Sequence, residues 1–313
     1  MILSTPKGIA LSEIIETGIL RLGMCLNFEG LSFKVRGKLQ GLEVELARLL
    51  AEEMGKILHQ PIRLKVIDQE WSQILDMLRE RKYHAIFSAL IPSSMYQRFF
   101  VQYTRPYLYT GIVNVAPLDE QGHVVGGVTK DASSLKDKTI VIINDPAARR
   151  GLRRAGIYIE QDAQQNETSI YFPRHATLSE IEQAKKLEEK YGMVFVPPQL
   201  IPVTTIIQLD EMSLIYDLLV KRKVDAGVID LGIIWWVASQ SPRYAPYMKA
   251  YTHPIAKYIY SAVTNITDPD LHQILDEAIA TMYTREDYKK IVKQWHGGEL
   301  WQWSYDADDF VDL

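Results

Sequence analysis

The sequence predicts an α/β protein built from two lobes. Residues 74–88, ILDMLRERKYHAIFS, recur in altered form at 215–229, IYDLLVKRKVDAGVI, with an offset of about 141 positions. In each copy an apolar-periodic segment is followed by a basic turn and a short apolar run, which is typical of helix, turn and buried strand. The chain has 313 residues, 47% of them hydrophobic, which is sufficient for more than one core. We therefore expect two similar halves.

Helices and strands alternate in the first part of the chain. The expected elements are a helix at 12–17, a strand at 19–26, a hairpin at 34–41, a helix at 42–54 and a strand at 62–67. Residues 42–54 carry leucines on one helical face, and Gly55 is expected to end that helix in the left-handed conformation. Together with the first repeat copy, the order β-α-β-α-β favours a mostly parallel sheet covered by helices.

The middle of the chain predicts an inserted second lobe. Its expected features are a crossover near 108–114, a strand at 139–143, a helix start at Asp145-Pro146, an exposed excursion at 161–167, a capped helix at 179–192 and a return crossover near 253–258. Helices at 270–282 and 285–294 then complete the first lobe. We expect one lobe from residues 1–110 plus 257–313, and an inserted lobe from 111–256.

Composition and missing motifs argue against several classes of function. The formal net charge of −4 gives no reason to expect a nucleic-acid partner. The zincin, nucleophile-elbow, Walker and dinucleotide-binding motifs are absent from the sequence. The 7 histidines are scattered without metal-ligand spacing, and Cys25, the single cysteine, is expected to pack as a small apolar residue. We therefore expect a protein that is not an enzyme and that uses neither a cofactor nor a metal.

Membrane and targeting signals are weak. The longest uninterrupted apolar run, 231–238, is far shorter than the roughly 20 residues of a membrane-spanning helix. Polar residues at Ser4, Thr5 and Lys7 follow Met1, where a secretory signal would be apolar. We expect either a cytoplasmic protein or a secreted one whose signal segment is not part of this sequence.

The order of the motifs resembles a known family. The segments are LSEIIETGILRLGM, GLEVELARLLAEEMG, QEWSQILDMLRERKYHAIFSAL, YTRPY, KVDAGVID and DEAIATMYTREDYKKIVKQWHGG. Together they cover most of the chain and resemble the type II solute-binding proteins of the amino-acid-binding kind (family 3), the Venus-flytrap module of bacterial ABC importers. The resemblance implies two Rossmann-like lobes with mixed, mostly parallel sheets, joined by two crossover hinge strands.

The same resemblance implies a function and partners. A monomeric protein, periplasmic or lipid-anchored outside the cytoplasm, would capture a small zwitterion such as an amino acid by closing its hinge. It would then deliver the ligand to the membrane subunits of an ABC transporter. The signal segment would be missing from this sequence.

Two charged contacts to the ligand are implied by the resemblance. Arg98 would bind the ligand carboxylate, because a guanidinium forms a bidentate, charge-assisted pair with it. Counting back from Tyr103-Thr104 places that role on Gln97 instead, so both assignments stay open. Asp230, at the end of the second repeat strand, would receive the ligand ammonium.

The remaining predicted contacts are aromatic or polar. Phe28 and Trp71 would form walls around the ligand, and Glu29 would lie at the rim. Ser88 is the polar residue left at the end of the first repeat strand. Asp145 stands where the family has a Gly-Ser/Thr pair at a helix start. Its carboxylate would occupy the exposed helix N–H groups and make the pocket more favourable for a cation than for a second anion.

Each contact also has a structural alternative. The alternatives are a surface position for Arg98, core packing for Phe28 and Trp71, and a solvated loop acid for Glu29. Asp145 could simply cap a helix, and Asp230 could cap the following turn or form a salt bridge across the hinge. Two alternative functions stay open as well. One is a ligand-sensing module of a larger protein, and the other is a lyase similar to cyclohexadienyl dehydratase, for which only Glu29, Asp145 and Asp230 could supply the catalytic acid.

Overall fold

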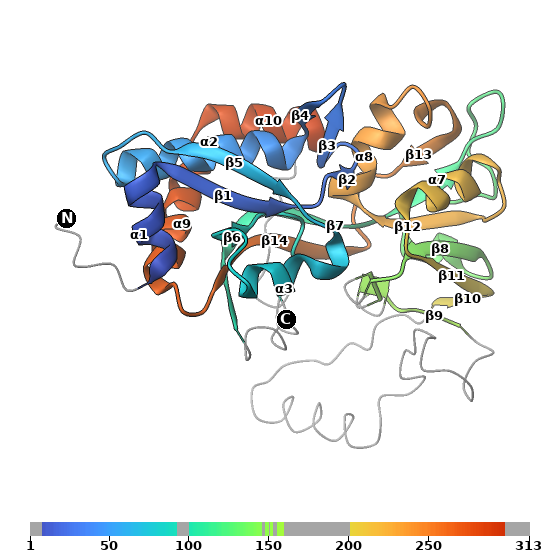
Figure 1. The fold of residues 1–313 in the computed structure, drawn as a ribbon. Coiled ribbons are helices and arrows are strands. Elements are labelled where there is room, and N and C mark those ends of the chain that lie inside the picture. The colour runs from blue at the N-terminus through green and yellow to red at the C-terminus, as the bar shows by residue number, and fades with distance from the viewer. Residues whose placement is uncertain are drawn as a thin grey trace, which may run out of the picture. The chain divides into compact units, whose positions relative to one another are not determined.

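The chain divides into two compact units in the computed structural model (Figure 1). The structure describes residues 8–92, 100–145, 148–149, 151–152, 155–159 and 201–297. The first unit consists of Met1–Thr110, Leu231–Val237 and Lys257–Leu313, and the second of Gly111–Asp230 and Ala238–Ala256. Both units combine a sheet containing parallel strands with helices, so the predicted α/β fold class is confirmed.

The first unit follows the order expected from the sequence. Its elements are α1 (Ile9–Thr17), β1 (Ile19–Met24), β2 (Asn27–Phe28), β3 (Ser32–Val35), β4 (Lys38–Gln40), α2 (Leu42–Ile57), β5 (Arg63–Asp68), the 3-10 turn η1 (Trp71–Gln73), α3 (Ile74–Arg79), β6 (Ala85–Ile86), most of β14 (Ala256–Asn265), α9 (Pro269–Met282) and α10 (Glu286–His296). Strand β1 pairs in parallel with β5 and β6, because a helix connects each strand to the next. Strand β14 lies antiparallel to β6.

Helix α2 corrects one sequence expectation. Its buried face contains Leu42, Leu46 and Leu50, as the apolar spacing predicts. Gly55 does not end the helix, which continues to Ile57. A Cβ at Gly55 would lie 2.9 Å from the carbonyl oxygen of Gln60. Glycine is therefore needed here for close approach of the chain, and not for a left-handed turn.

The second unit contains the other repeat copy. Its elements are the 3-10 turn η2 (Ala132–Leu135), β8 (Thr139–Ile143), β9 (Ile157–Ile159), β10 (Ile201–Val203), β11 (Thr205–Leu209), α7 (Met212–Val220), β12 (Ala226–Asp230), the 3-10 turn η3 (Ala245–Tyr247) and β13 (Met248–Ala250). Strand β8 is parallel to both β11 and β12. The repeat predicted helix then strand in both copies, and the structure has α3 before β6 and α7 before β12.

Besides β14, whose first residue Ala256 lies in the second unit, two elements span the boundary between the units. Strand β7 (Val101–Pro117) supplies its first part to the first unit and its last part to the second. Helix α8 (Leu231–Gln240) belongs to the first unit up to Val237, whereas the sequence assigned this segment to the inserted lobe. The reason is aromatic packing, because the Trp236 ring lies 5.3 Å from Phe33 and 6.0 Å from Trp295. The other lobe limits, 1–110 plus 257–313 and 111–256, stay a prediction.

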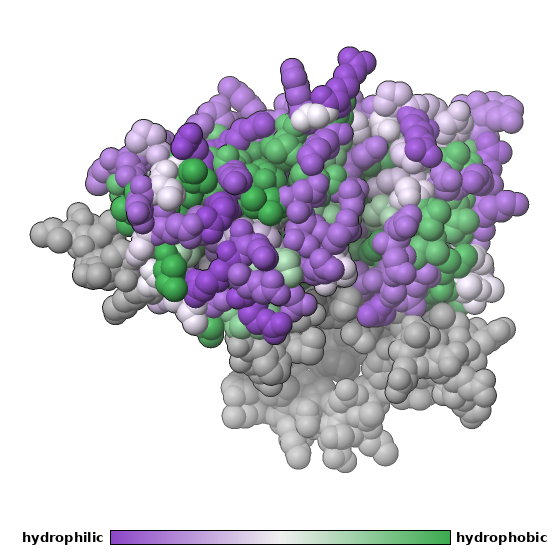
Figure 2. All heavy atoms as spheres, in the orientation of Figure 1, coloured by the Kyte–Doolittle hydropathy of each residue, from purple (hydrophilic) through white to green (hydrophobic). Residues whose placement is uncertain are grey.

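Polar side chains cover most of the described surface in the view of Figure 2. The large apolar side chains that are exposed there and elsewhere come from both units: Ile9, Ile15, Val35, Val125, Leu214, Tyr247 and Ile266. Within the described part of the chain, no helix combines the length and the apolar character needed to cross a membrane. The helix expected at 179–192 and the excursion at 161–167 lie outside the described residues.

Candidate functional site

The carboxyl edge of the first unit's sheet collects three of the predicted contacts. Strands β5, β1 and β6 are parallel, with Met24 level with Asp68 and Gly23 level with Ile86. Their carboxyl ends therefore lie at one edge, which is where α/β sheets bind ligands. Phe28, Trp71 and Ser88 each follow one of these strands closely.

Phe28 and Trp71 are brought together by the fold. Their ring centroids are 5.8 Å apart in an edge-to-face arrangement, with an interplanar angle of 81°. Both side chains are half-buried, so part of each ring faces solvent. Aromatic pairs of this geometry attract one another beyond simple burial. The pair forms an apolar wall, and its contact with a ligand stays a prediction.

Ser88 is fully buried and has a defined hydrogen bond. Its Oγ accepts from the backbone N–H of Cys25 at 3.0 Å, and the carbonyl of Cys25 accepts from Ser32 Oγ at 2.6 Å. These bonds connect the carboxyl ends of β6 and β1 with strand β3. Burial raises the pKa of the Cys25 thiol, in agreement with a packed residue. Glu29, in contrast, is exposed.

A buried acid that the sequence analysis missed lies behind this edge. Glu43, in the first turn of α2, is 0% exposed. Its Oε1 accepts from the backbone N–H of Ala89 at 2.6 Å and from the Tyr107 hydroxyl. One signal was present in the sequence, because position 43 lies three residues before Leu46 and seven before Leu50 on the apolar stripe. An acid on such a stripe requires a buried partner.

Three aspartates lie at the carboxyl edge of the strands in the second unit. Asp145 lies two residues beyond β8, Asp210 directly follows β11, and Asp230 is the last residue of β12. These strands are parallel neighbours, so the two predicted contacts, Asp145 and Asp230, lie on the same edge. Both are half-buried. Asp230 immediately precedes α8, and the Asp145 carbonyl accepts from Arg149 N–H at 3.1 Å, as at a helix start.

Arg149 is a second residue that the sequence analysis did not select. Its Nη1 donates to Asn144 Oδ1 at 2.8 Å and to Gln208 Oε1 at 3.3 Å. Asn144 in turn donates from Nδ2 to Asp210 Oδ1 at 2.9 Å. This network holds a guanidinium at the same edge as the acids. The sequence pattern does not identify it, because the bonds to Gln208 and from Asn144 to Asp210 join segments more than fifty residues apart.

The predicted carboxylate partner and a metal site can be considered together. Arg98 and its alternative Gln97 lie outside the described residues. Among the residues that are described, no group of three or more His, Cys, Asp or Glu side chains is arranged to hold a metal ion.

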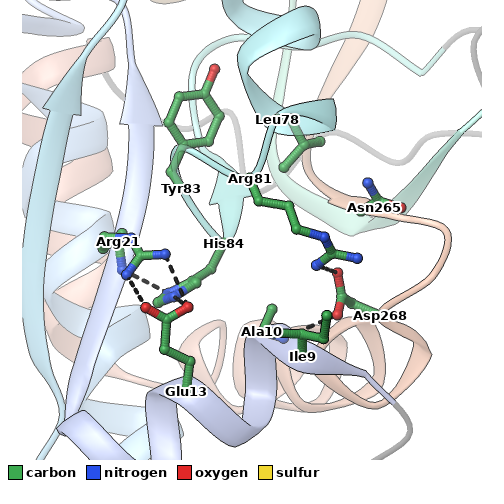
Figure 3. A pocket seen from close by; sticks show the side chains of 10 residues that line it. All are labelled: Ile9, Ala10, Glu13, Arg21, Leu78, Arg81, Tyr83, His84, Asn265 and Asp268. Atoms are coloured by element: carbon green, nitrogen blue, oxygen red, sulfur yellow. Dashed lines mark hydrogen bonds and ion pairs between the residues drawn. The ribbon is translucent and has the colours of Figure 1, made fainter.

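A separate cavity in the first unit is lined by residues of α1, β1, the turn after α3 and the segment before α9 (Figure 3). Around it Arg21 pairs with Glu13, and Arg81 Nη1 lies 2.9 Å from Asp268 Oδ2. His84 Nδ1 accepts from the Arg21 backbone N–H at 3.0 Å, and its Nε2 is 3.3 Å from Glu13 Oε2. Burial lowers the pKa of His84, and the hydrogen bond from Arg21 lowers that of Glu13. The Glu13–Arg21 pair binds α1 to β1, and the Arg81–Asp268 pair binds the turn after α3 to the start of α9.

Comparison with known families gives one match. Residues 20–298 match the model of bacterial extracellular solute-binding proteins, family 3. A search of curated proteins finds no match.

Solved structures share the fold at low sequence identity. A mutant of the arginine-binding protein from T. maritima is 17% identical, with a TM-score of 0.58 over 93% of this chain and 100% of that one. An ancestral amino-acid-binding protein, described as a precursor of cyclohexadienyl dehydratase, is 17% identical, with a TM-score of 0.59 over 91% and 98%. The substrate-binding protein of an amino acid ABC transporter is 16% identical, with a TM-score of 0.57 over 90% and 100%. These similarities show a common fold.

Proposed function

Since the chain belongs to family 3 of the bacterial extracellular solute-binding proteins, we propose that it captures a small zwitterion and delivers it to an ABC transporter. The ligand is an amino acid or a close derivative. The observation that carries this proposal is the pairing of Phe28 with Trp71 at a carboxyl strand edge. Family membership supports capture of a solute, and the similarity to an arginine-binding protein and to the substrate-binding protein of an amino acid ABC transporter supports the amino-acid class.

Each end of the ligand has a proposed partner. The apolar part packs on the Phe28–Trp71 pair, since aromatic walls with few polar groups are the usual lining of small-ligand sites. Asp230 takes the ammonium through a charge-assisted hydrogen bond, and Arg98 takes the carboxylate. Ser88, Glu29 and Asp145 remain proposed contributors at the same two strand edges.

Capture is proposed to work through hinge closure. A ligand that binds residues of both units has a higher affinity for the closed state than for the open state. It therefore shifts the population toward closure by that difference in affinity. The transporter would recognise the closed form. In keeping with the family, we place the protein outside the cytoplasm, in the periplasm or on a lipid anchor.

A lyase on the same scaffold is the second candidate. The observation in its favour is the neighbour described as a precursor of cyclohexadienyl dehydratase. A lyase needs a catalytic acid beside the substrate, and Glu29, Asp145 and Asp230 are the candidates for that role.

Ligand-exchange mass spectrometry separates these functions. The purified protein is first unfolded and refolded to remove carried-over ligand, and is then incubated with a mixture of L-amino acids and with hydroxylated cyclohexadienyl acids. A binding protein retains one compound with its mass unchanged. Release of a product that has lost water or carbon dioxide would instead identify a lyase.

A further inference from the structure

The corner that follows β6, residues 88–90, has a strained backbone. Ala89 adopts a φ of 47°, in the left-handed region that residues with a Cβ rarely occupy. Ser88 is fully buried before it, and the carbonyl of Leu90 after it accepts from Ser261 N–H at 2.9 Å. An unfavourable conformation persists only where the surroundings hold it.

Glu43 is the group that holds this corner. The N–H of Ala89 donates to Glu43 Oε1 at 2.6 Å and also lies 3.0 Å from the Tyr107 hydroxyl. That hydroxyl donates to the same carboxylate oxygen, and the Tyr107 ring stacks on Phe87 with centroids 3.9 Å apart. Glu43, Tyr107 and Phe87 are all fully buried, so no water can replace the carboxylate.

Backbone and side-chain bonds connect the corner with Phe28 of the aromatic pair. Ser88 Oγ accepts from Cys25 N–H, and the Cys25 carbonyl accepts from Ser32 Oγ. Ser32 pairs in β3 with Phe28 of β2. Residues 88–90 are therefore connected to Phe28 by two buried hydrogen bonds and by the pairing of β3 with β2.

We propose that Glu43 is a positioning residue of the ligand site, which sets ligand affinity by fixing the corner at 88–90 without touching the ligand. The part that concerns affinity rests on the proposed function. The part that concerns the corner does not, and it can be measured without any ligand.

Cys25 reports on the corner. It is the only cysteine in the chain, it is 2% exposed, and its N–H is bonded to Ser88. The rate at which a thiol reagent such as DTNB modifies it in the native protein measures local opening of this edge. Glu43→Leu removes the carboxylate acceptor at similar volume and leaves Ala89 N–H only the Tyr107 hydroxyl, whereas Glu43→Gln keeps an amide oxygen that can accept both bonds.

Glu53→Leu is the matched control. Glu53 is a second buried acid of α2, but its partners are Lys56 and Arg285, on α2 and at the start of α10, and not the corner. We expect Cys25 modification to be at least tenfold faster in Glu43→Leu than in wild type, intermediate in Glu43→Gln, and within about twofold of wild type in Glu53→Leu. Equal acceleration in Glu43→Leu and Glu53→Leu, or none in either, would overturn the proposal.

Ala89→Gly provides a rescue. Glycine adopts a positive φ more readily than alanine does. The difference corresponds to roughly fivefold in the equilibrium between the closed and the locally opened corner. Added to Glu43→Gln, it should slow Cys25 modification about fivefold. Because this double variant keeps an amide at position 43, the test remains if Glu43→Leu does not fold. Absence of rescue would show that Glu43 does not act through the Ala89 backbone.

The affinity arm uses the twenty L-amino acids as thermal-shift probes. For the amino acid that stabilises the wild type, Glu43→Gln should raise Kd about fivefold and Glu53→Gln less than twofold. Faster Cys25 modification with an unchanged Kd would contradict the positioning role. If no amino acid stabilises the wild type, the proposed function fails, whereas the Cys25 rates still decide whether Glu43 holds the corner.

Discussion

Arg81 and Arg222 adopt the same left-handed backbone conformation, with φ angles of 60° and 53°, at equivalent positions of the two repeat copies. In both copies the arginine N–H bonds three residues back, to Leu78 or Leu219. The following lysine N–H then bonds to the carbonyl five residues before it. The shared basic turn is thus a helix-terminating motif that directs the chain into β6 or β12.

Replacing each arginine by glycine separates backbone from side-chain effects. Arg222→Gly should stabilise the protein by about 0.5 kcal/mol, because glycine tolerates a positive φ and the Arg222 Nε bond to the Leu118 carbonyl lies at an exposed site. Arg81→Gly should destabilise it by about 1 to 2 kcal/mol, because buried Asp268 loses its ion pair. Urea unfolding measures both, and an equal effect of the two substitutions would contradict this explanation.

The long periodic elements could be predicted from the sequence because the spacing of their apolar residues does not depend on which segments they pack against. Residues 42–54 form a helix and 139–143 a strand wherever their apolar faces are covered. The role of Gly55 could not be predicted, because it depends on contact with Gln60 after the chain turns. The assignment of 231–237 depends on the rings of Phe33 and Trp295, which are distant in the sequence.

Asp230→Asn should weaken ligand binding by about 2 to 5 kcal/mol. Removing one partner of a desolvated charge pair leaves the ligand ammonium without compensation. Isothermal calorimetry with the amino acid that binds the wild type measures the change. Asp210→Asn, on the same edge but bonded to Asn144, is the control and should have a smaller effect. Unchanged affinity in Asp230→Asn would leave Asp230 a structural residue.

Phe28→Leu should raise the ligand Kd about fivefold, equivalent to about 1 kcal/mol, because the aromatic pair with Trp71 is lost while the volume is nearly kept. The same substitution at Phe33, which is buried against Trp236 and Trp295, should lower the thermal midpoint but leave Kd within twofold. The reverse pattern would place the aromatic contribution in the core and not in the ligand site.

Stability should decrease as the pH falls below about 6.5. Burial lowers the pKa of His84 and His272, and it lowers that of fully buried His296 to about 3. Each histidine has a folded pKa below its unfolded value of 6.5, so the unfolded state binds more protons in that range. Stability is fully present above 6.5 and is lost as the pH falls through the folded pKa values.

His296 alone should account for roughly 2 kcal/mol between pH 6.5 and pH 5. The pKa values of Glu13 and Asp276 are lowered from their ordinary values of 4.5 and 3.8, so protonation of these carboxylates affects stability mainly below pH 5. Urea midpoints at pH 7 and pH 5 measure the loss. His296→Gln, which can keep a hydrogen bond to Thr110 Oγ1, should remove much of it. A variant with the same pH dependence as the wild type would exclude His296 as the source.

Some residues of the candidate site could be predicted from the sequence and others could not, as was the case for the fold. Phe28 and Trp71 could be placed together because both follow parallel strands, and the carboxyl ends of such strands share an edge. Glu43 could be recognised as unusual from its place on an apolar stripe. Its partner Ala89 could not be recognised, because that bond depends on a left-handed corner 46 positions later. Arg149 shows no local signal at all.

Thermal shift against a panel of L-amino acids, their decarboxylated amines and short peptides tests the central claim most directly. A ligand that binds the folded state raises the thermal midpoint by mass action. We expect that one or a few L-amino acids stabilise the wild type and that the matching amines do so much less. Arg98→Ala should abolish the response with little change in the ligand-free midpoint. Equal stabilisation of wild type and Arg98→Ala by the amines alone would contradict it, and would indicate a cation pocket formed by Asp145 and Asp230.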